Sequence, residues 1–315
     1  MKHYTTALRA ESEGDPYVTA VTQWLTGEVA GHLGPYMYVD DPDDKCWADA
    51  HSAAAYYFKK DEMDTFRLVM KDLRIQVENL FDLGPGGESS IISKSIPLLE
   101  AARASRYYPV DFSPALAARA ANLVTEKRNI HSEPVVADFF EPLPLSTSNS
   151  LIAFMGGTLG NIETHQSRPA IKDRLIKLFA QFRKVVTGKS YYLVSFDSNT
   201  DSGEILSCYQ NGGIERLIRG CIEKAIDITD FEYDATWQPD TMRLAMGLRS
   251  KRDQIIHFDG VQHAIEKGEF LSVLNSYRYP AEFVVDAASE AGWDHVQTWS
   301  ATGRVHYQLY ETKRL

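Results

Sequence analysis

A turn of three glycines and a proline, at residues 84–87, could hold a phosphate, a dinucleotide or another adenosine-bearing cofactor. It lies between an apolar run and a stretch of helical periodicity, in the sequence FDLGPGGESSI. A P-loop would continue to a lysine followed by serine or threonine, and this turn does not. A dinucleotide fingerprint would have a glycine where Ser89 stands. A tight strand-to-helix connection without a ligand is the alternative explanation of the glycines.

Two of the strands predicted after this turn end in acidic residues. Asp111 ends the next strand, where a carboxylate can accept hydrogen bonds from both hydroxyls of a ribose. Asp138 ends the following strand and could meet the amino group of an adenine, on whose ring Phe139 could stack. An isolated aspartate at a strand end is more often a helix cap. Acids in register after successive strands favour a nucleoside-binding site instead.

The charges beside the glycine turn favour one cofactor over another. Asp82 and Glu88 would repel a pyrophosphate, whereas they would attract the α-amino group and the sulfonium of S-adenosylmethionine (SAM). We therefore predict SAM as the cofactor and S-adenosyl-L-homocysteine as its product. The residues predicted to bind it are Gly84, Gly86, Gly87, Asp111, Asp138, Phe139, Gly157 and Thr158.

A second glycine turn follows the fourth predicted strand, in the sequence SLIAFMGGTLGN. It places Asn161 where a polar group would face the substrate. Methyltransferases that act on DNA bases and on glutamine side chains carry Asn-Pro-Pro-Tyr at this place, so the sequence argues against those substrates.

Other kinds of site have no support in the sequence. The nine histidines are scattered and no HExxH occurs, so we expect no metal. Cys46, Cys208 and Cys221 form no CxxC pair, which argues against a disulfide framework or a zinc knuckle. No GxSxG is present for an acyl-transfer nucleophile. Methyl transfer to nitrogen requires only a neutral amine, held about 3 Å from the methyl carbon and shielded from water.

Alternating strands and helices must position these residues. From about residue 63 to residue 200, short apolar runs alternate with stretches of helical spacing, which predicts a parallel sheet covered on both faces. Residues 295–313 predict two strands joined by a Thr-Gly turn, which would add an antiparallel edge strand. We therefore predict an α/β fold with a Rossmann-like class I SAM-dependent methyltransferase core. In such sheets, ligands bind outside the carboxyl ends of the strands.

Two segments interrupt this alternation. Residues 1–62 predict broken helices, and residues 201–276 mix helical stretches with alternating, strand-like ones. We predict that residues 1–62 and 201–276 fold together as an α+β substrate-binding cap domain. Residues 63–200 and 277–315 would then form the SAM-binding domain.

Composition limits the partners. Of the 315 residues, 44% are hydrophobic and 24% charged, as in globular proteins with a core, and the net charge of −10 argues against nucleic acid. No apolar run reaches the ~18 residues of a membrane span, and the N-terminus lacks a hydrophobic signal core. We expect a cytoplasmic protein without a membrane partner, a monomer or weak homodimer, acting on a small cationic or zwitterionic substrate.

Six segments resemble, in order and spacing, the histidine-specific Nα-methyltransferase family. This family includes the first enzyme of ergothioneine biosynthesis and the fungal N-methyltransferase acting on dimethylallyltryptophan. The similarity covers about residues 35–315, and its most distinctive segments are GGTLGN and NSYRYP. The other four are DLGPGGESS, YYPVDFS, ADFFEPL and SFDSNTDSGEILSCY. Where the family's glycine loop often continues to a lysine, this sequence has Ser89 and Ser90.

The resemblance implies residues that bind an amino acid. In the family, the asparagine after the fourth strand and a downstream tyrosine bind the carboxylate, and they correspond to Asn161 and Tyr209. Two tyrosines of the N-terminal segment face the amino group and the side chain, and Tyr38 and Tyr57 match them. We predict Asn161, Tyr38 and Tyr57 as catalytic residues. A buried core ring is the alternative for each tyrosine.

One departure from the family bears on specificity. Histidine-specific members have a glutamate that accepts the imidazole N–H where this sequence has Leu274, and an unpaired imidazole N–H costs about 1–3 kcal/mol. Leu274 and Met246, with Ser276 nearby, predict an apolar pocket. We therefore expect Nα-methylation of an amino acid or derivative with an aromatic or apolar side chain, tryptophan-like or tyrosine-like. L-Histidine is the alternative substrate, and a SAM-binding module without turnover is the alternative of another class.

Overall fold

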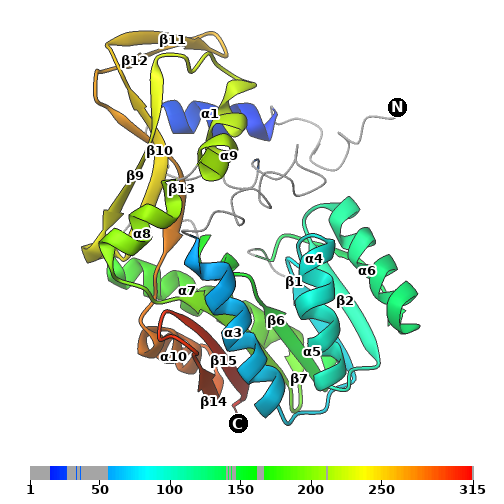
Figure 1. The fold of residues 1–315 in the computed structure, drawn as a ribbon. Helices are drawn as coiled ribbons and strands as arrows, with labels where there is room; N and C mark the ends of the chain where they lie inside the picture. Colours follow the sequence, from blue (N-terminus) through cyan, green and yellow to red (C-terminus); the bar gives the residue numbers. More distant parts are fainter. Residues whose placement is uncertain are drawn as a thin grey trace.

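The centre of the protein is an eight-stranded mixed sheet (Figure 1). The computed structural model describes residues 15–26, 33, 36, 56–139, 141, 143, 147–161, 167–210 and 212–313. Along the sheet the strands follow the order β14-β15-β8-β6-β1-β2-β3, and β4 also pairs with β2. The parallel strands are β1 (Asn79–Leu83), β2 (Arg106–Asp111), β3 (His131–Ser132), β4 (Val135–Val136), β6 (Ser150–Phe154) and β8 (Tyr191–Asp197).

The predicted closing hairpin is present, but its place in the sheet corrects our prediction. Strands β14 (Trp293–Trp299) and β15 (Val305–Thr312) are antiparallel to each other, and β15 is antiparallel to β8. The antiparallel strand β15 is therefore second from the edge, and β14 is the edge strand. Burial explains this order, because β15 is buried along most of its length whereas β14 exposes Val296 at 47%.

This strand order, with one antiparallel strand inserted beside the edge, is that of the predicted Rossmann-like class I methyltransferase core. The third predicted strand, over residues 133–139, is shorter than expected, since within this range only β4 pairs with β2, and β3 precedes it.

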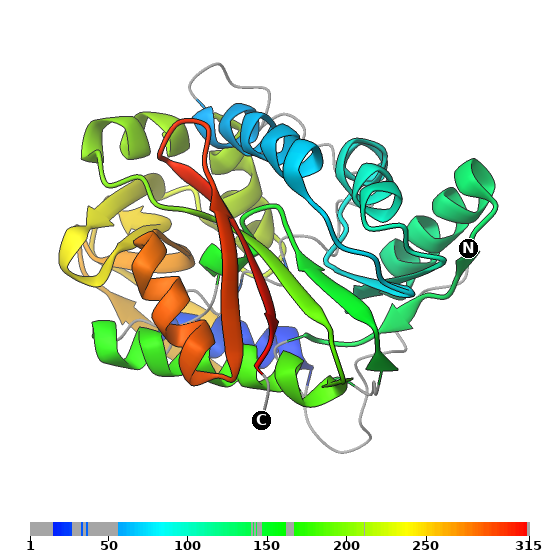
Figure 2. The same ribbon diagram turned by 90° about the horizontal axis from the view of Figure 1, so that it is seen from below.

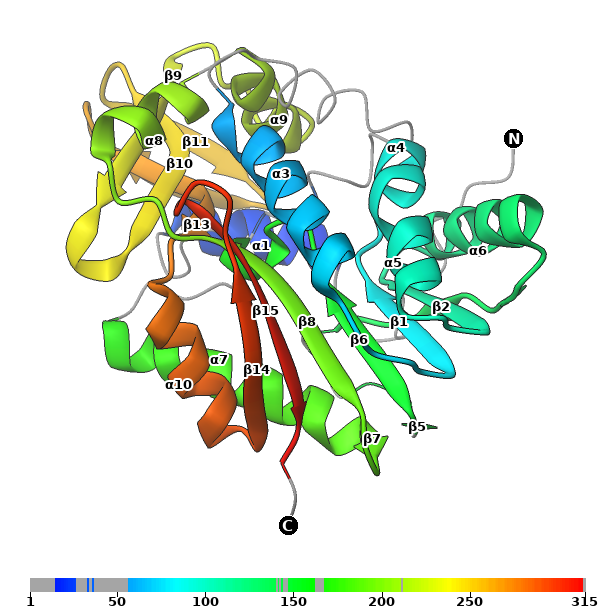
Figure 3. The ribbon, with the colours of Figure 1, turned by 60° about the horizontal axis from the view of Figure 1, so that its bottom comes forward.

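Helices cover both faces of the sheet (Figures 2 and 3). Side chains alternate along each strand: Leu151 and Ala153 join one hydrophobic cluster, whereas Ile152 and Phe154 join the other. The first cluster packs against α3 (Tyr57–Asp72), α5 (Ile96–Ala101) and α6 (Pro114–Arg128). The second packs against α7 (Arg168–Val185) and α10 (Ala281–Glu290).

Local sequence sets the ends of these helices. Pro114 stands in the first turn of α6, where its missing N–H leaves no intrahelical bond unmade, and the Ser113 hydroxyl accepts from the Leu116 N–H. The helix ends at Asn129 in a left-handed conformation. The short elements of the core are α4 (Glu88–Ser90), the π-helical η2 (Ile91–Ser95), the 3-10 helix η3 (Thr158–Asn161) and the strand pair β5 (Thr147–Ser148) and β7 (Val186–Thr187).

A second region lies beyond the carboxyl edge of the parallel strands (Figure 1). Its core is one hydrophobic cluster, which gathers buried residues between Ala20 and Phe58 with others between Ile205 and Leu274. Its sheets are β9 (Phe231–Gln238), β10 (Arg243–Ser250) and β13 (Phe270–Tyr277), and the hairpin β11 (Gln254–Phe258) and β12 (Val261–Ile265). Its helices are α1 (Pro16–Leu25), α8 (Ser202–Tyr209), α9 (Gly212–Glu223) and the 3-10 helix η4 (Pro239–Thr241).

This cluster supports our proposal of a cap domain, although its predicted border at residue 62 falls inside α3. The first turn of that helix contributes Phe58 to the cluster of the second region, and its later turns contribute Phe66 and Val69 to the core. Among the described residues, no helix is long and apolar enough to cross a membrane.

A β-bulge fixes the register of β10 against β13. Met246 pairs with Leu274, and the register then shifts so that Gly247 pairs with Ser272. A Cβ atom on Gly247 would lie 2.1 Å from the carbonyl oxygen of Leu271. Only glycine therefore permits this approach of the two backbones.

We predict that Gly247→Ala lowers the free energy of unfolding by about 3 kcal/mol, because the strands must separate to admit the methyl group. Thermal or denaturant unfolding would measure it. Gly220→Ala in α9 is the matched control, because a Cβ there meets no atom within 4 Å and alanine favours helix. A Gly247→Ala protein as stable as this control would contradict the prediction.

Candidate active site

The glycine turn after β1 has the backbone conformation that a close ligand contact requires. Gly84 and Gly86 have positive φ angles of 61° and 74°, which side-chain-bearing residues rarely adopt. The Gly84 N–H donates to the Val110 carbonyl at 2.9 Å, which ties the turn to the end of β2. Gly87 has extended backbone and begins α4. The turn therefore lies at the carboxyl ends of β1 and β2.

The three predicted nucleoside contacts differ in exposure. Asp111 is buried at the end of β2, where its Oδ1 accepts from the Ser113 N–H at 2.9 Å. Phe139 is buried against the ring of Phe154, and its ring atom Cε1 lies 3.6 Å from the position of a Cβ on Gly84. Asp138 is exposed. Asp111 and Phe139 therefore lie beside the glycine turn.

The acid before the turn is not at the surface. Asp82 is buried and accepts from the hydroxyl of Tyr107 at 2.9 Å. Burial raises the pKa of Asp82, and the hydrogen bond from Tyr107 and the nearby Lys94 ammonium partly oppose this. Of the two carboxylates that we expected beside the cofactor, only Glu88 is exposed.

A buried carboxylate of α3 holds the second glycine turn. Glu62 accepts from the Gly156 N–H at 2.8 Å and from the Tyr307 hydroxyl at 3.0 Å. Both of its oxygens lie 3.2 Å from the Lys94 ammonium, which neutralises the buried charge. This pair could not be predicted from the sequence, because Glu62 and Lys94 lie in separate stretches of ordinary helical periodicity.

The second turn packs tightly on both sides. Gly157 has a φ of 75°, and a Cβ there would lie 2.6 Å from the Phe58 ring. A Cβ on Gly160 would lie 3.0 Å from the Tyr277 carbonyl at the end of β13. Thr158 donates to the Met155 carbonyl at 3.4 Å. These contacts place Asn161, the last residue of η3 and partly buried, between the core and the second region.

A buried ion pair joins β8 to the segment after β13. Arg278 Nε lies 2.9 Å from Asp197 Oδ2, and the two side chains are 1% and 6% exposed. The hydroxyl of Tyr57 donates to the same oxygen at 2.6 Å. The Asn199 N–H donates to the other oxygen at 2.8 Å. Tyr57 itself is only partly buried.

The guanidinium of Arg278 also orders its other neighbours. Its Nη1 donates to the hydroxyl of Ser276 at 2.7 Å, and its Cζ lies 5.1 Å from the centre of the Tyr209 ring. Tyr209 ends α8 and packs edge-on against Tyr56 at 5.7 Å. Among the described residues, Arg278 Nη2 has no hydrogen-bond partner although it is buried. An anionic ligand would satisfy it.

Met246 and Leu274 were predicted to line an apolar pocket. Met246 and Leu274 are adjacent across β10 and β13, and both are buried in the cluster that contains Tyr209. The neighbouring Asn275 is buried too, and its Oδ1 accepts from Ser272.

The structure brings together most of the predicted substrate residues and adds two. Tyr57, Tyr209 and Ser276 all contact the pair of Arg278 and Asp197, which sequence reasoning missed. Arg278 lies in the distinctive NSYRYP segment, which was the available signal. Tyr38 and Cys46 lie outside the described residues.

Two cysteines lie among the described residues. Cys208 and Cys221 are buried and take part in no disulfide. Burial raises the pKa of the Cys208 thiol to about 12, so it stays protonated at neutral pH.

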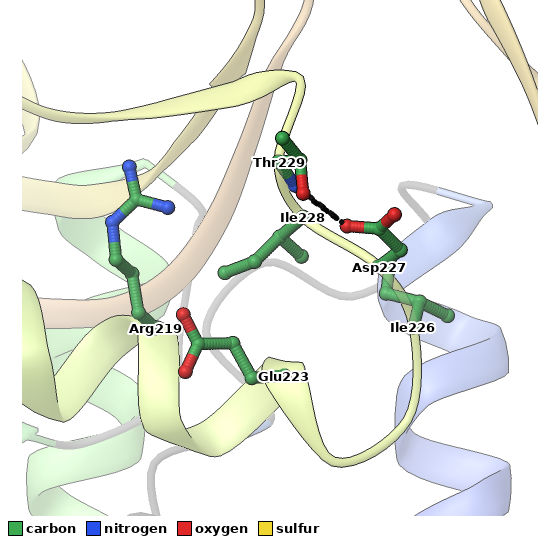
Figure 4. Close-up of a pocket in the computed structure, with 6 residues that line it drawn as sticks. All are labelled: Arg219, Glu223, Ile226, Asp227, Ile228 and Thr229. Carbon is green, nitrogen blue, oxygen red and sulfur yellow. Dashed lines mark hydrogen bonds between the residues drawn. The ribbon is translucent and has the colours of Figure 1, made fainter.

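A surface hollow of about 430 Å³ in the second region contains none of these residues (Figure 4). Arg219 donates to Glu215 at 2.8 Å, and Asp227 accepts from Thr229, which lowers the pKa of Asp227. Two of the charged groups that line the hollow, Arg219 and Asp227, are therefore engaged by neighbours. Its lining residues are Arg219, Glu223, Ile226, Asp227, Ile228 and Thr229.

Residues 18–313 match the family described as histidine-specific, SAM-dependent methyltransferases. The chain belongs to this family. The resemblance found in the sequence is confirmed, and the protein is a methyltransferase that uses SAM. Its carboxyl edge fits this cofactor, because a glycine turn with positive φ angles stands beside a buried acid, Asp111, and an aromatic ring, Phe139.

Solved structures are similar to the chain at low sequence identity. A SAM-dependent methyltransferase from Clostridium acetobutylicum ATCC 824 is 12% identical with a TM-score of 0.49, over 89% of this chain and 98% of that one. SAM-bound CalS10 from Micromonospora echinaspora, an amino pentose methyltransferase, is 11% identical with a TM-score of 0.39, over 85% and 96%. The comparison with curated proteins found no match.

We propose that Asp111 accepts the ribose hydroxyls, and we predict that Asp111→Asn weakens S-adenosylhomocysteine binding about tenfold. Asparagine retains the oxygen that accepts from Ser113 but loses the charge that strengthens the ribose bonds. Isothermal calorimetry would measure the affinity. Glu126→Gln, at an exposed position of α6, is the control with the same loss of charge. Equal affinities of the two variants would contradict the assignment.

Proposed function

We propose that the protein methylates the α-amino group of an amino acid or close derivative whose side chain is aromatic or apolar. SAM supplies the methyl group when it is bound. The residues of this chain orient the amine, receive the carboxylate and shape the pocket.

The observation that carries this proposal is the pairing of opposite charges beside an apolar wall. A zwitterion presents one carboxylate and one ammonium group, and this site offers Arg278 for the first and the Tyr57–Asp197 pair for the second. We propose that Asn161 and Tyr209 assist at the carboxylate. The buried Nη2 of Arg278 supports this, because its N–H groups are unsatisfied by the described residues.

The side-chain preference is inferred from the wall next to these charges. Met246 and Leu274 provide no acceptor for a polar N–H, so a histidine side chain would lose a hydrogen bond on entering. A tryptophan-like or tyrosine-like ring would instead bury its apolar faces there.

L-Histidine is the second candidate, because the family's description names histidine. Another acceptor would then have to replace the missing glutamate. The buried side chain of Asn275, next to Leu274, is the nearest polar group in the sequence.

We predict that the enzyme methylates L-tryptophan or L-tyrosine with a higher kcat/KM than L-histidine, and that Leu274→Glu raises kcat/KM for L-histidine about tenfold. The new carboxylate would accept the imidazole N–H. Mass spectrometry with isotopically labelled SAM would measure the products.

Leu274→Met is the control, because it changes the shape of the wall without adding an acceptor. S-Adenosylhomocysteine affinity would show that each variant keeps its fold. Preference of the unaltered enzyme for L-histidine would contradict the apolar-pocket proposal and support the second candidate.

A further inference from the structure

An α-amino group must lose a proton before it can be methylated, and this site contains a route for it. At neutral pH the amine is an ammonium group, whose nitrogen has no lone pair. A site without a proton acceptor can use only the small neutral fraction of the substrate. A site with one can bind the abundant zwitterion and deprotonate it.

We propose that Asp197 accepts, through the Tyr57 hydroxyl, the proton that the substrate's ammonium group loses. The inference rests on the proposed function, because it assumes an α-ammonium group in the substrate. Tyr57 would contact the substrate, whereas Asp197 acts through Tyr57.

The geometry fixes the direction of this route. Tyr57 already donates its proton to Asp197 Oδ2 at 2.6 Å, so its oxygen can only accept a hydrogen bond from a further group. Asp197 is buried, whereas Tyr57 is partly exposed, so the phenol is the more accessible of the two groups. The bond from the Asn199 N–H holds the other carboxylate oxygen and thereby the orientation of Asp197.

The step balances in protons and electrons. The ammonium N–H bond breaks, its electron pair stays on nitrogen, and the proton moves to the Tyr57 oxygen. The Tyr57 O–H bond breaks at the same time, and that proton moves to Asp197 Oδ2. The site then holds a neutral amine, an intact phenol and a neutral Asp197, whose proton returns to water after the product leaves.

The surrounding charges suit a carboxylate that gains and loses a proton. Burial raises the pKa of Asp197, while Arg278, the Tyr57 hydroxyl and the Asn199 N–H oppose this. Burial also raises the pKa of Tyr57, which therefore relays the proton as a phenol and never stores the charge. Among the described residues, the other titratable or charged groups around Tyr57 and Asp197 include Asp61, Cys208, Tyr209 and Arg304. His306, which stacks on Phe196, is a further one.

The buried arginine links this step to substrate recognition. Arg278 stabilises the charged form of Asp197 in the free enzyme. A substrate carboxylate beside its Nη2 would share that positive charge and weaken its hold on Asp197. Asp197 would then become a stronger proton acceptor when a zwitterion occupies the site.

The test is the pH dependence of kcat/KM for the best substrate among L-tryptophan, L-tyrosine and L-histidine. With the relay, kcat/KM of the unaltered enzyme stays nearly constant between about pH 8 and about pH 6, because the ammonium form is the substrate. In Tyr57→Phe and Asp197→Asn, only the neutral amine reacts, so kcat/KM falls about tenfold per pH unit below the amine pKa. The double variant is expected to match either single one.

Tyr17→Phe is the matched control. Tyr17 also donates from its hydroxyl, to the Cys221 carbonyl at 2.7 Å, but lies in α1 outside the site. Its profile is expected to follow that of the unaltered enzyme. If Asp197→Asn fails to fold, the pH profile of Tyr57→Phe alone tests the relay, because the Tyr57→Phe change removes only one oxygen atom. Retained S-adenosylhomocysteine affinity would show that each variant is intact.

Two results would overturn the proposal in different ways. Parallel pH profiles of Tyr57→Phe and the unaltered enzyme would eliminate the relay and leave the proposed function standing. A folded enzyme that binds S-adenosylhomocysteine but methylates none of the three amino acids would overturn the proposed function and the relay together.

Discussion

The buried ion pair of Arg278 and Asp197 is the interaction on which the candidate substrate site depends. It joins the segment after β13 to the carboxyl end of β8, and the Tyr279 N–H reinforces it by donating to the Asp197 carbonyl at 2.9 Å. Removing one partner of such a pair typically costs about 3–5 kcal/mol, because the other charge is left buried. The same two side chains orient Tyr57 and Tyr209, so structure and substrate recognition share one set of contacts.

Helix α3 connects this site to the cofactor edge. In its first turn, Tyr57 donates a hydrogen bond to Asp197 and Phe58 packs against Gly157. In its next turn, Glu62 accepts from the Gly156 N–H. The later turns pack on the core sheet. A shift of α3 would therefore move the phenol and the second glycine turn together. A helix outside the sheet thus contacts both the substrate side of the candidate site, at Asp197, and the second glycine turn.

The sequence predicted the features that short-range patterns encode. Alternating apolar runs indicated the parallel strands, and glycines marked turns that do have positive φ angles, at Gly84 and Gly86. The sequence could not predict which of β14 and β15 lies at the edge of the sheet, because the two segments have similar strand-like patterns. They differ in how far other elements bury them. Arg278 was missed for a related reason. An arginine normally indicates a surface, and its burial depends on Asp197, 81 residues earlier (278 − 197).

We propose that a zwitterion lies at the carboxyl edge with its amine at Tyr57 and its carboxylate at Arg278. A crystal structure with S-adenosylhomocysteine and the best amino-acid substrate tests it most directly. We expect the substrate nitrogen within hydrogen-bond distance of the Tyr57 oxygen and a carboxylate oxygen within hydrogen-bond distance of Arg278 Nη2. An amino acid bound away from both residues, or bound with its ends exchanged, would contradict it.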